Sequence, residues 1–368
     1  SKKDERIFYL ISFIIVSLLF WYFLPNGFLF NNRYLPFYYI YSLLIASLGI
    51  GSMIPSKSRI KVLFVLSILS LTILYISNST KFIKYWISWN YEGFEAKKWN
   101  EISPLFEYLK SLPYGRVMHE YNPQQDKFGS PRTLESIPYF SQKPVMEGLL
   151  IESAICSPFH FWMQAKLSKQ PSCPISYVGC TNYNVSEGYE YLKLFNVKYF
   201  VAYTEEIKEE MNRNTNFYLL RSINDFNVYE VRGENRFSEF INNITVLPRR
   251  NWLNKSLEWF KNEDFSNFII FDDDLYSKVK RKNIFYDSTN CSVKESLKNE
   301  ELSIDTSCIG KPLLIKIPYF PRWKVEGADK IYLASPCFML VYPEKEHIKI
   351  YYGRNVVDYL GIFFTVFA

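Results

Sequence analysis

Three uncharged, strongly apolar runs near the N-terminus constrain this 368-residue chain more than any other feature. They cover residues 7–24, 34–54 and 62–79. A helix needs about 20 mostly apolar residues to cross ~30 Å of hydrocarbon. The runs therefore predict three transmembrane helices within residues 1–80. Residues 356–368 are apolar but too short to span, so we expect them to begin a fourth helix and the chain to be a fragment.

The short segments between these runs differ in charge, which predicts an orientation. Arg33 is the only basic residue between the first two runs, whereas three basic residues precede the first run and three lie between the second and third. Because Lys and Arg are enriched on the cytoplasmic side, residues 81–355 are predicted to lie outside the cytoplasm. Lys81 and Lys84 count against this orientation but are fewer. The predicted location is the cell membrane, with a multi-pass topology.

All six cysteines follow residue 155, as expected for an oxidising compartment. The near pairs Cys173/Cys180 and Cys291/Cys308 are the first disulfide candidates, and the connectivity stays open. The sequence has no Cys-x-x-Cys and no Cys/His pair at zinc spacing, so we expect no structural metal site. Five Asn-x-Ser/Thr triplets are compatible with an outside location, although such triplets also arise by chance.

The predicted fold class is transmembrane α-helices plus a large extracytoplasmic α/β domain, followed by a small β-sandwich-like module. Residues 81–235 alternate between helical and strand patterns, which is typical of an α/β domain, with strands predicted at Arg116–Glu120 and Val197–Ala202 and a hairpin around Asn224-Asp225. Residues 236–312 are mixed and are interpreted as a connecting region. Residues 313–355 contain short strands separated by turn residues, which predicts the β-sandwich-like module.

The usual catalytic signatures are absent from the sequence. It contains no G-x-G-x-x-G, P-loop, H-E-x-x-H or G-x-S-x-G motif. The net charge of +6 is mild and spread out, so nucleic acid is not an expected partner. Asp272–Asp274 follow a predicted strand, but they lack the alternating ligands and the glycine of a calcium loop. An acidic helix start with an N-cap carboxylate is the favoured interpretation.

Five residues are candidates for binding or catalysis, and four of them have a structural alternative. Arg33 lies beside a predicted span and could hold a lipid phosphate bidentately, or serve as a snorkelling anchor. Glu147 and Glu152 flank an apolar run and could act as a general base, although a cap or surface role is favoured. His160 is a further pocket candidate. Trp323 could stack on a sugar ring, although a core position is favoured.

Several short motifs together resemble archaeal and actinobacterial multi-pass membrane proteins labelled "6-pyruvoyl-tetrahydropterin synthase-related". These proteins are similar to type C glycosyltransferases, including bacterial proteins of the YfhO kind and mycobacterial arabinofuranosyltransferases. The motifs are Asn31–Phe37, Trp89–Gly93 with Gly115–Val117, Glu147–Leu149 with Glu152–Ser153, Phe195–Phe200, and Tyr319–Trp323 with Gly327–Ala328.

The resemblance implies an envelope glycosyltransferase that uses a polyprenyl-phosphate-linked sugar and a glycan acceptor, with membrane lipid around its helices. In such enzymes an acidic residue of the first outer loop acts as the base, and that loop would precede Ser1. No catalytic residue is therefore carried over, no cofactor is evident, and any divalent metal would belong to the missing part. The three scattered histidines do not fit the zinc site of a pterin synthase.

A non-catalytic envelope protein is the alternative to the transferase. Its outer domain would bind glycan or a protein partner. The upstream sequence would separate the two hypotheses, because further spans and an acidic outer loop would favour the enzyme.

Overall fold

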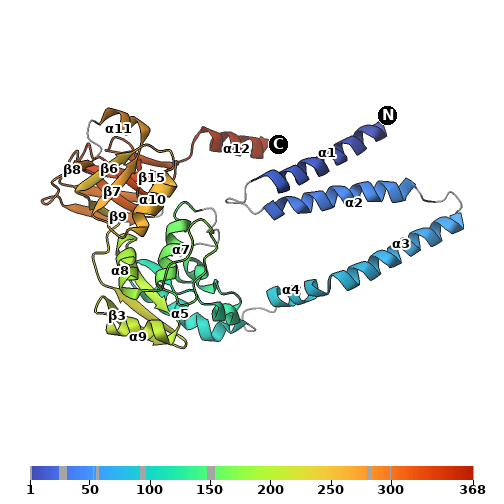
Figure 1. Cartoon of the computed structure of the whole chain (residues 1–368), viewed down its shortest axis with the longest axis horizontal. Coiled ribbons are helices and arrows are strands. Elements are labelled where there is room, and N and C mark those ends of the chain that lie inside the picture. Colours follow the sequence, from blue (N-terminus) through green and yellow to red (C-terminus); the bar gives the residue numbers. More distant parts are fainter. Residues whose placement is uncertain are drawn as a thin grey trace. The chain divides into compact units, whose positions relative to one another are not determined.

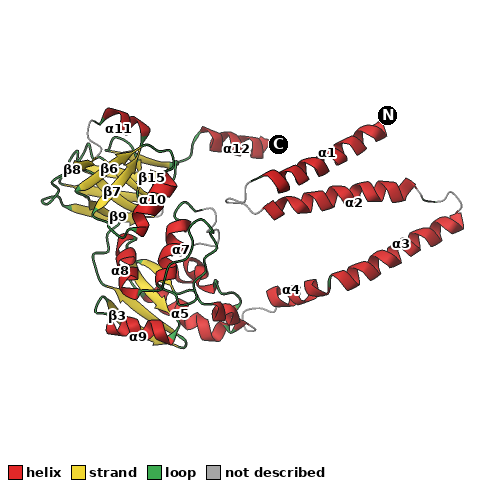
Figure 2. Cartoon of the chain, viewed as in Figure 1, coloured by secondary structure: helices red, strands yellow, loops and turns green. Residues whose placement is uncertain are grey.

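The structure, a computed structural model, describes residues 2–24, 31–52, 54, 58–91, 97–146, 154–279, 283–298 and 300–367. The chain divides into two compact units, residues 1–96 and residues 97–368 (Figure 1). The first unit is helical, whereas the second contains all the strands that the structure describes (Figure 2).

Aromatic contacts join the first two helices of the N-terminal unit. The rings of Phe13 and Tyr41 stack with their centroids 4.8 Å apart, and Phe20 meets Tyr34 edge-on at 5.4 Å. The elements of this unit are α1 (Lys2–Phe23), the 3₁₀ turn η1 (Asn31–Tyr34), α2 (Leu35–Ser52), α3 (Ser58–Ser79) and α4 (Lys81–Tyr91).

The prediction of a three-span, multi-pass membrane protein is wrong. Among the described residues, two helices are long and apolar enough to cross a membrane, Leu35–Ser52 and Arg59–Ser79, and neither window is buried. The run predicted as the first span lies in α1, where the apolar stretch Ile7–Phe23 is shorter. Helix α1 ends at Phe23, so Leu24 at the end of the predicted run lies outside the helix, and the charged residues at positions 2–6 prevent the apolar stretch from extending in the other direction. The apolar part of the last helix, Val356–Val366, is shorter still.

A four-stranded sheet organises the first half of the second unit, in the order β1-β2-β4-β3. The strands β1 and β2 are parallel, and the other neighbours are antiparallel. Asn224 turns the β3–β4 hairpin with a φ of 50°, a left-handed conformation that asparagine tolerates. The strands are β1 (Arg116–His119), β2 (Val197–Ala202), β3 (Phe217–Ile223) and β4 (Phe226–Val231).

Helices with one apolar face pack around this sheet. Helix α9, for example, buries Ile207, Lys208 and Met211 at helical spacing and exposes most of its other side. The helices are α5 (Trp99–Ser111), α6 (Ile137–Ser141), α7 (Ser157–Lys166), α8 (Val185–Leu194) and α9 (Glu205–Arg213), with 3₁₀ turns η3 (Pro123–Phe128) and η4 (Thr133–Ser136).

Two further sheets form the rest of the unit. One has seven strands in the order β5-β11-β14-β13-β7-β6-β8, and the other has four in the order β12-β15-β10-β9. Strands β6 and β7 are parallel, and α10 connects them. The elements are β5 (Ser238–Phe240), β6 (Asn243–Leu247), α10 (Trp252–Lys261), β7 (Asn267–Phe271), α11 (Asp273–Lys278), β8 (Asn283–Phe285), β9 (Val293–Lys298), β10 (Glu301–Thr306), β11 (Leu313–Pro318), β12 (Trp323–Glu326), β13 (Tyr332–Ala334), β14 (Phe338–Val341), β15 (His347–Tyr352) and α12 (Val356–Phe367).

The predicted β-sandwich-like module at residues 313–355 is also corrected. Strands β11, β13 and β14 join the seven-stranded sheet, while β12 and β15 join the four-stranded one. Both sheets take their remaining strands from residues 238–306, so residues 313–355 do not form a module of their own. Apolar residues of both sheets share one core cluster, which includes Leu302 and Ile350 from one sheet and Leu313 and Met339 from the other. The strand pattern was correct, but it carries no information on which distant strand each one pairs with.

The α/β half and the β-rich half share the largest core cluster of the unit. The ring of Phe195, from the end of α8, meets that of Phe338 on β14 with centroids 5.0 Å apart. The Arg116 guanidinium of β1 donates to the carbonyl oxygens of Phe195 and Lys316, the latter at 3.2 Å. Burial lowers the pKa of Arg116 to about 10. A buried cation therefore ties β1 to β11.

Candidate functional site

A cleft of about 510 Å³ lies where the parallel strands β1 and β2 end. Ligands of α/β proteins commonly bind outside the carboxyl ends of such strands, because the loops that follow them converge there. The walls come from η3, the segment after α7, the start of α9 and the β3–β4 turn. The lining residues are Asn122, Gln124, Lys127, Lys169, Gln170, Tyr203, Thr204, Glu205, Glu206, Lys208 and Asp225. We call this the strand-end cleft.

Glu120, the residue directly after β1, fixes one wall of the strand-end cleft. Its fully buried carboxylate accepts hydrogen bonds from the backbone N–H groups of Tyr203 (2.7 Å) and Thr204 (2.9 Å). The Thr204 hydroxyl donates a third bond at 2.8 Å. Burial raises the pKa of Glu120, while these hydrogen bonds and nearby Lys208 act in the opposite direction. The carboxylate thus holds the start of α9 beside the end of β1.

Two of the three lysines that line the strand-end cleft are held in ion pairs. Lys127 forms an ion pair with Asp225, and its ammonium lies 4.9 Å from the ring centroid of Phe128. Burial opposes the charged form of Lys127, but its hydrogen bond to Asp225 leaves the pKa raised. Lys208 pairs with Glu205 at 2.7 Å. The three lining lysines face three lining carboxylates, so the cleft has no excess of either charge.

Uncharged hydrogen-bonding groups complete the strand-end cleft. The Asn122 side chain accepts from the Gln124 backbone N–H at 2.8 Å and so caps η3. Gln124 and Gln170 are exposed carboxamides, each able to donate and to accept. The half-buried ring of Tyr203 packs on Phe226 with centroids 5.4 Å apart. The arrangement offers donors, acceptors and an aromatic edge on a fixed frame.

A second cleft, of about 460 Å³, lies at the other end of α9. It is lined by Val185, Ser186, Glu210, Arg213, Asn214, Thr215 and Asn216. Tyr183 lies beside Glu210, and burial together with this carboxylate raises the pKa of its hydroxyl. The second cleft is not at the ends of the parallel strands, so the strand-end cleft is the stronger candidate.

The candidates predicted from sequence lie elsewhere. Arg33 is exposed in η1 of the first unit, and Glu147 and Glu152 fall outside the described residues. His160 is only 2% exposed, within α7. Trp323 is partly buried against the core of the β-rich half and meets Tyr352 edge-on at 5.8 Å. None of the described candidates lines either cleft.

Sequence reasoning missed the lining of the strand-end cleft, although a signal was present. Both parallel strands were predicted, and Glu120 and Tyr203 directly follow them. Polar residues at that position are the ones that a strand-end site would use. The sequence alone does not show that β1 pairs with β2, because about 80 residues separate the two strands.

No group of three or more His, Cys, Asp or Glu residues in the described part of the chain could hold a metal ion. The aspartates considered for calcium start a helix instead. Asp272 is the N-cap of α11, and its carboxylate accepts from the Leu275 backbone N–H at 2.8 Å. Lys330 pairs with Asp272 at 2.8 Å. The favoured N-cap interpretation is confirmed.

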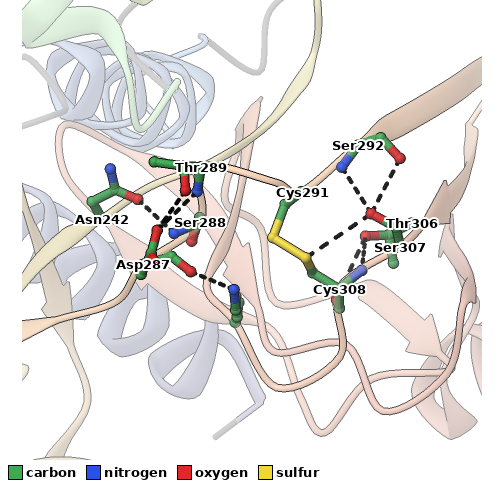
Figure 3. The surroundings of a disulfide bond; sticks show 10 residues. Asn242, Asp287, Ser288, Thr289, Cys291, Ser292, Thr306, Ser307 and Cys308 are labelled. Carbon is green, nitrogen blue, oxygen red and sulfur yellow. Dashed lines mark hydrogen bonds between the residues drawn. A yellow bond between two sulfur atoms is a disulfide. The ribbon is translucent and has the colours of Figure 1, made fainter.

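Three disulfides cross-link the second unit. Cys173–Cys180 and Cys291–Cys308, the two near pairs of the sequence, are both bonded, and Cys156–Cys337 is the third. Figure 3 shows that Cys291–Cys308 lies among hydrogen-bonded hydroxyl side chains. The pair flanks the end of the β9–β10 hairpin, whose last register pair is Val293 and Thr306.

These cross-links bear on where the protein resides. Disulfides persist in oxidising compartments and are rare in the cytosol. Together with the apolar helices near the N-terminus, they indicate a secreted or envelope protein. The helices themselves fit either a membrane anchor or a signal sequence.

Residues 102–243 match the family described as "Domain of unknown function (DUF8559)". The match runs from α5 to the first residue of β6 and so contains the whole β1-β2-β4-β3 sheet and every lining residue of the strand-end cleft. No curated protein and no solved structure matches the chain. The resemblance to type C glycosyltransferases stays a prediction.

Proposed function

We propose that the chain is an envelope protein whose second unit binds an uncharged saccharide in the strand-end cleft. The observation that carries the proposal is the composition of the lining, in which three lysines are balanced by three carboxylates and joined by two exposed carboxamides. Ligand sites fix orientation with a few well-placed polar groups on a preformed frame. A polyhydroxyl ligand needs donors and acceptors side by side, and this lining offers both.

Other ligand classes fit the strand-end cleft less well. A strongly anionic ligand would have to compete with Asp225 for Lys127 and with Glu205 for Lys208. A cationic ligand would likewise have to compete with Lys127 for Asp225 and with Lys208 for Glu205. An apolar ligand would leave the carboxamides and ion pairs without water, at a cost of about 1–3 kcal/mol for each polar group left unsatisfied.

This role also fits the two hypotheses drawn from the sequence. In a transferase that uses a polyprenyl-phosphate-linked sugar, the strand-end cleft would hold the glycan acceptor. In a non-catalytic envelope protein, binding would itself be the function. We infer that the second unit resides outside the cytoplasm, where its disulfides are stable.

Titration of neutral and charged oligosaccharides against the full chain in detergent tests the proposal. We expect neutral glycans to bind and Gln124→Ala with Gln170→Ala to weaken them about tenfold or more, because each lost hydrogen bond costs about 1 kcal/mol. Asn216→Ala in the second cleft is the matched control and should leave affinity unchanged. The proposal would be contradicted if Asn216→Ala weakened glycan binding as much as the double glutamine variant does. It would also be contradicted if only charged oligosaccharides bound.

A further inference from the structure

Helix α12 is apolar around its whole circumference, and its described side chains face solvent on every side. Its sequence contains one charged residue, Asp358. A helix of this composition is normally buried in protein or in lipid. The exposed large apolar residues are Val356, Val357, Tyr359, Leu360, Ile362, Phe363, Phe364 and Val366.

The single acidic residue of α12 is already neutralised. The Arg322 guanidinium pairs with one Asp358 carboxylate oxygen at 2.7 Å. The other oxygen accepts from the Asn355 backbone N–H at 2.8 Å, which caps the helix. The helix therefore presents no net charge at its start.

Hydrogen bonds fix the start of α12 to the edge of the four-stranded sheet. The Gly353 N–H donates to the Arg322 carbonyl oxygen at 3.0 Å. The Lys324 ammonium donates to the Arg354 carbonyl oxygen at 2.9 Å. Because α12 directly follows β15, which pairs with the edge strand β12, the helix leaves the sheet at this edge.

An aromatic cluster and three cations surround this junction. The rings of Phe320 and Tyr352 stack with centroids 6.0 Å apart, and Trp323 meets Tyr352 edge-on. Phe320 is 48% exposed and Tyr352 36%. The cations are Arg322, Lys324 and Arg354. Aromatic side chains favour the membrane interface, and basic side chains favour anionic headgroups.

We propose that this junction, formed by α12 and the β12–β15 edge, docks on an anionic lipid bilayer. The junction brings together an apolar helix, an aromatic cluster and basic side chains, the three kinds of group that a bilayer accommodates in its hydrocarbon, at its interface and at its anionic headgroups. The exposed apolar side chains of α12 would enter the hydrocarbon and so be removed from water. A second copy of the chain would bury the apolar helix but would leave Lys324 and Arg354 without anionic partners, because Asp358 already pairs with Arg322, and this favours lipid.

Fluorescence quenching by brominated lipids tests the docking. The full chain is reconstituted in vesicles of phosphatidylcholine, with or without phosphatidylglycerol, whose acyl chains are brominated near the headgroup. The difference between the wild type and Trp323→Phe isolates the signal of Trp323. We expect this signal to be quenched, and more strongly with phosphatidylglycerol.

Charge reversal at the junction gives the second measurement. Lys324→Glu with Arg354→Glu should lower the docked-to-undocked ratio by about fivefold per charge, because a cation at an anionic surface contributes about 1 kcal/mol. Lys294→Glu with Lys298→Glu is the matched control, since β9 is the opposite edge of the same sheet. Saccharide binding by each variant serves as a separate check of the fold.

Three outcomes would overturn the docking. The first is a Trp323 signal that brominated lipids do not quench. The second is an equal loss of quenching in the β9 control. The third is a dimer that forms without lipid and dissociates on Phe320→Ala, which would assign the surface to a second copy.

Discussion

Removing the Cys156–Cys337 disulfide should destabilise the second unit more than removing either of the other two. A disulfide restricts the unfolded chain, and the stabilisation grows with the logarithm of the number of residues in the loop that it closes. The three bonds close loops of 181, 17 and 7 residues. The loop-entropy relation then gives about 5 kcal/mol for Cys156–Cys337, about 3 for Cys291–Cys308 and about 2.5 for Cys173–Cys180.

Two features of the fold bear on this ranking. The two smaller loops lie inside the large one, but they shorten it little, and the logarithm makes that change minor. Cys156 and Cys337 are only 5% and 0% exposed, so truncation to alanine also leaves a cavity. That cavity adds to the cost and keeps Cys156–Cys337 first in the order.

Urea unfolding of the full chain in detergent, followed by pulse proteolysis without reductant, measures the three double alanine variants. Removing a cross-link expands the unfolded state and raises the slope of free energy against urea. The comparison therefore uses the extrapolated free energy of unfolding and not the midpoint. A Cys173→Ala, Cys180→Ala variant that loses as much as Cys156→Ala, Cys337→Ala would refute the loop-entropy reasoning.

Three further predictions concern single residues. Arg116→Met should cost about 3 kcal/mol or more, because two buried carbonyl oxygens lose a charged donor, and urea unfolding checks the value. Glu120→Gln should flatten the pH dependence of stability. The pKa of Glu120 is raised in the folded state, so the folded state binds the Glu120 proton before the unfolded state does as the pH falls. The wild type therefore gains stability relative to the variant between neutral pH and the ordinary carboxyl pKa. Parallel plots of unfolding free energy against pH for the two proteins would contradict this. Gly327→Ala should cost about 2 kcal/mol, because Gly327 has a φ of +82° and an added Cβ would lie 2.2 Å from the His347 carbonyl oxygen; an unchanged melting temperature would be the contrary result.

Local features of the fold could be predicted from the sequence because they depend on near neighbours. The buried strand Val197–Ala202 was predicted with its observed bounds, and the β3–β4 hairpin was predicted around Asn224. The N-cap at Asp272 and the two disulfides within short loops were also found from local spacing. In each case the interacting residues lie within about 20 positions of each other.

Long-range features could not be predicted, because one sequence does not encode partners explicitly. Leu313 of β11 pairs with Phe240 of β5, and Leu302 of β10 pairs with Ile350 of β15. These pairings split the expected C-terminal module between two sheets. The strand-end cleft has the same origin, since its walls come from four separated segments. A candidate list drawn from single motifs therefore pointed elsewhere, as Trp323 illustrates.

The shared core sets limits on how this protein can be dissected. A fragment cut at the bounds of the matched family, residues 102–243, would end at the first residue of β6. It would also lack Cys337, so Cys156 could not form its disulfide. It would also expose the face of Phe195 that now meets Phe338. A fragment of residues 97–355 keeps the α/β half and the β-rich half together. We therefore expect this fragment to fold, although it is shorter than the full chain.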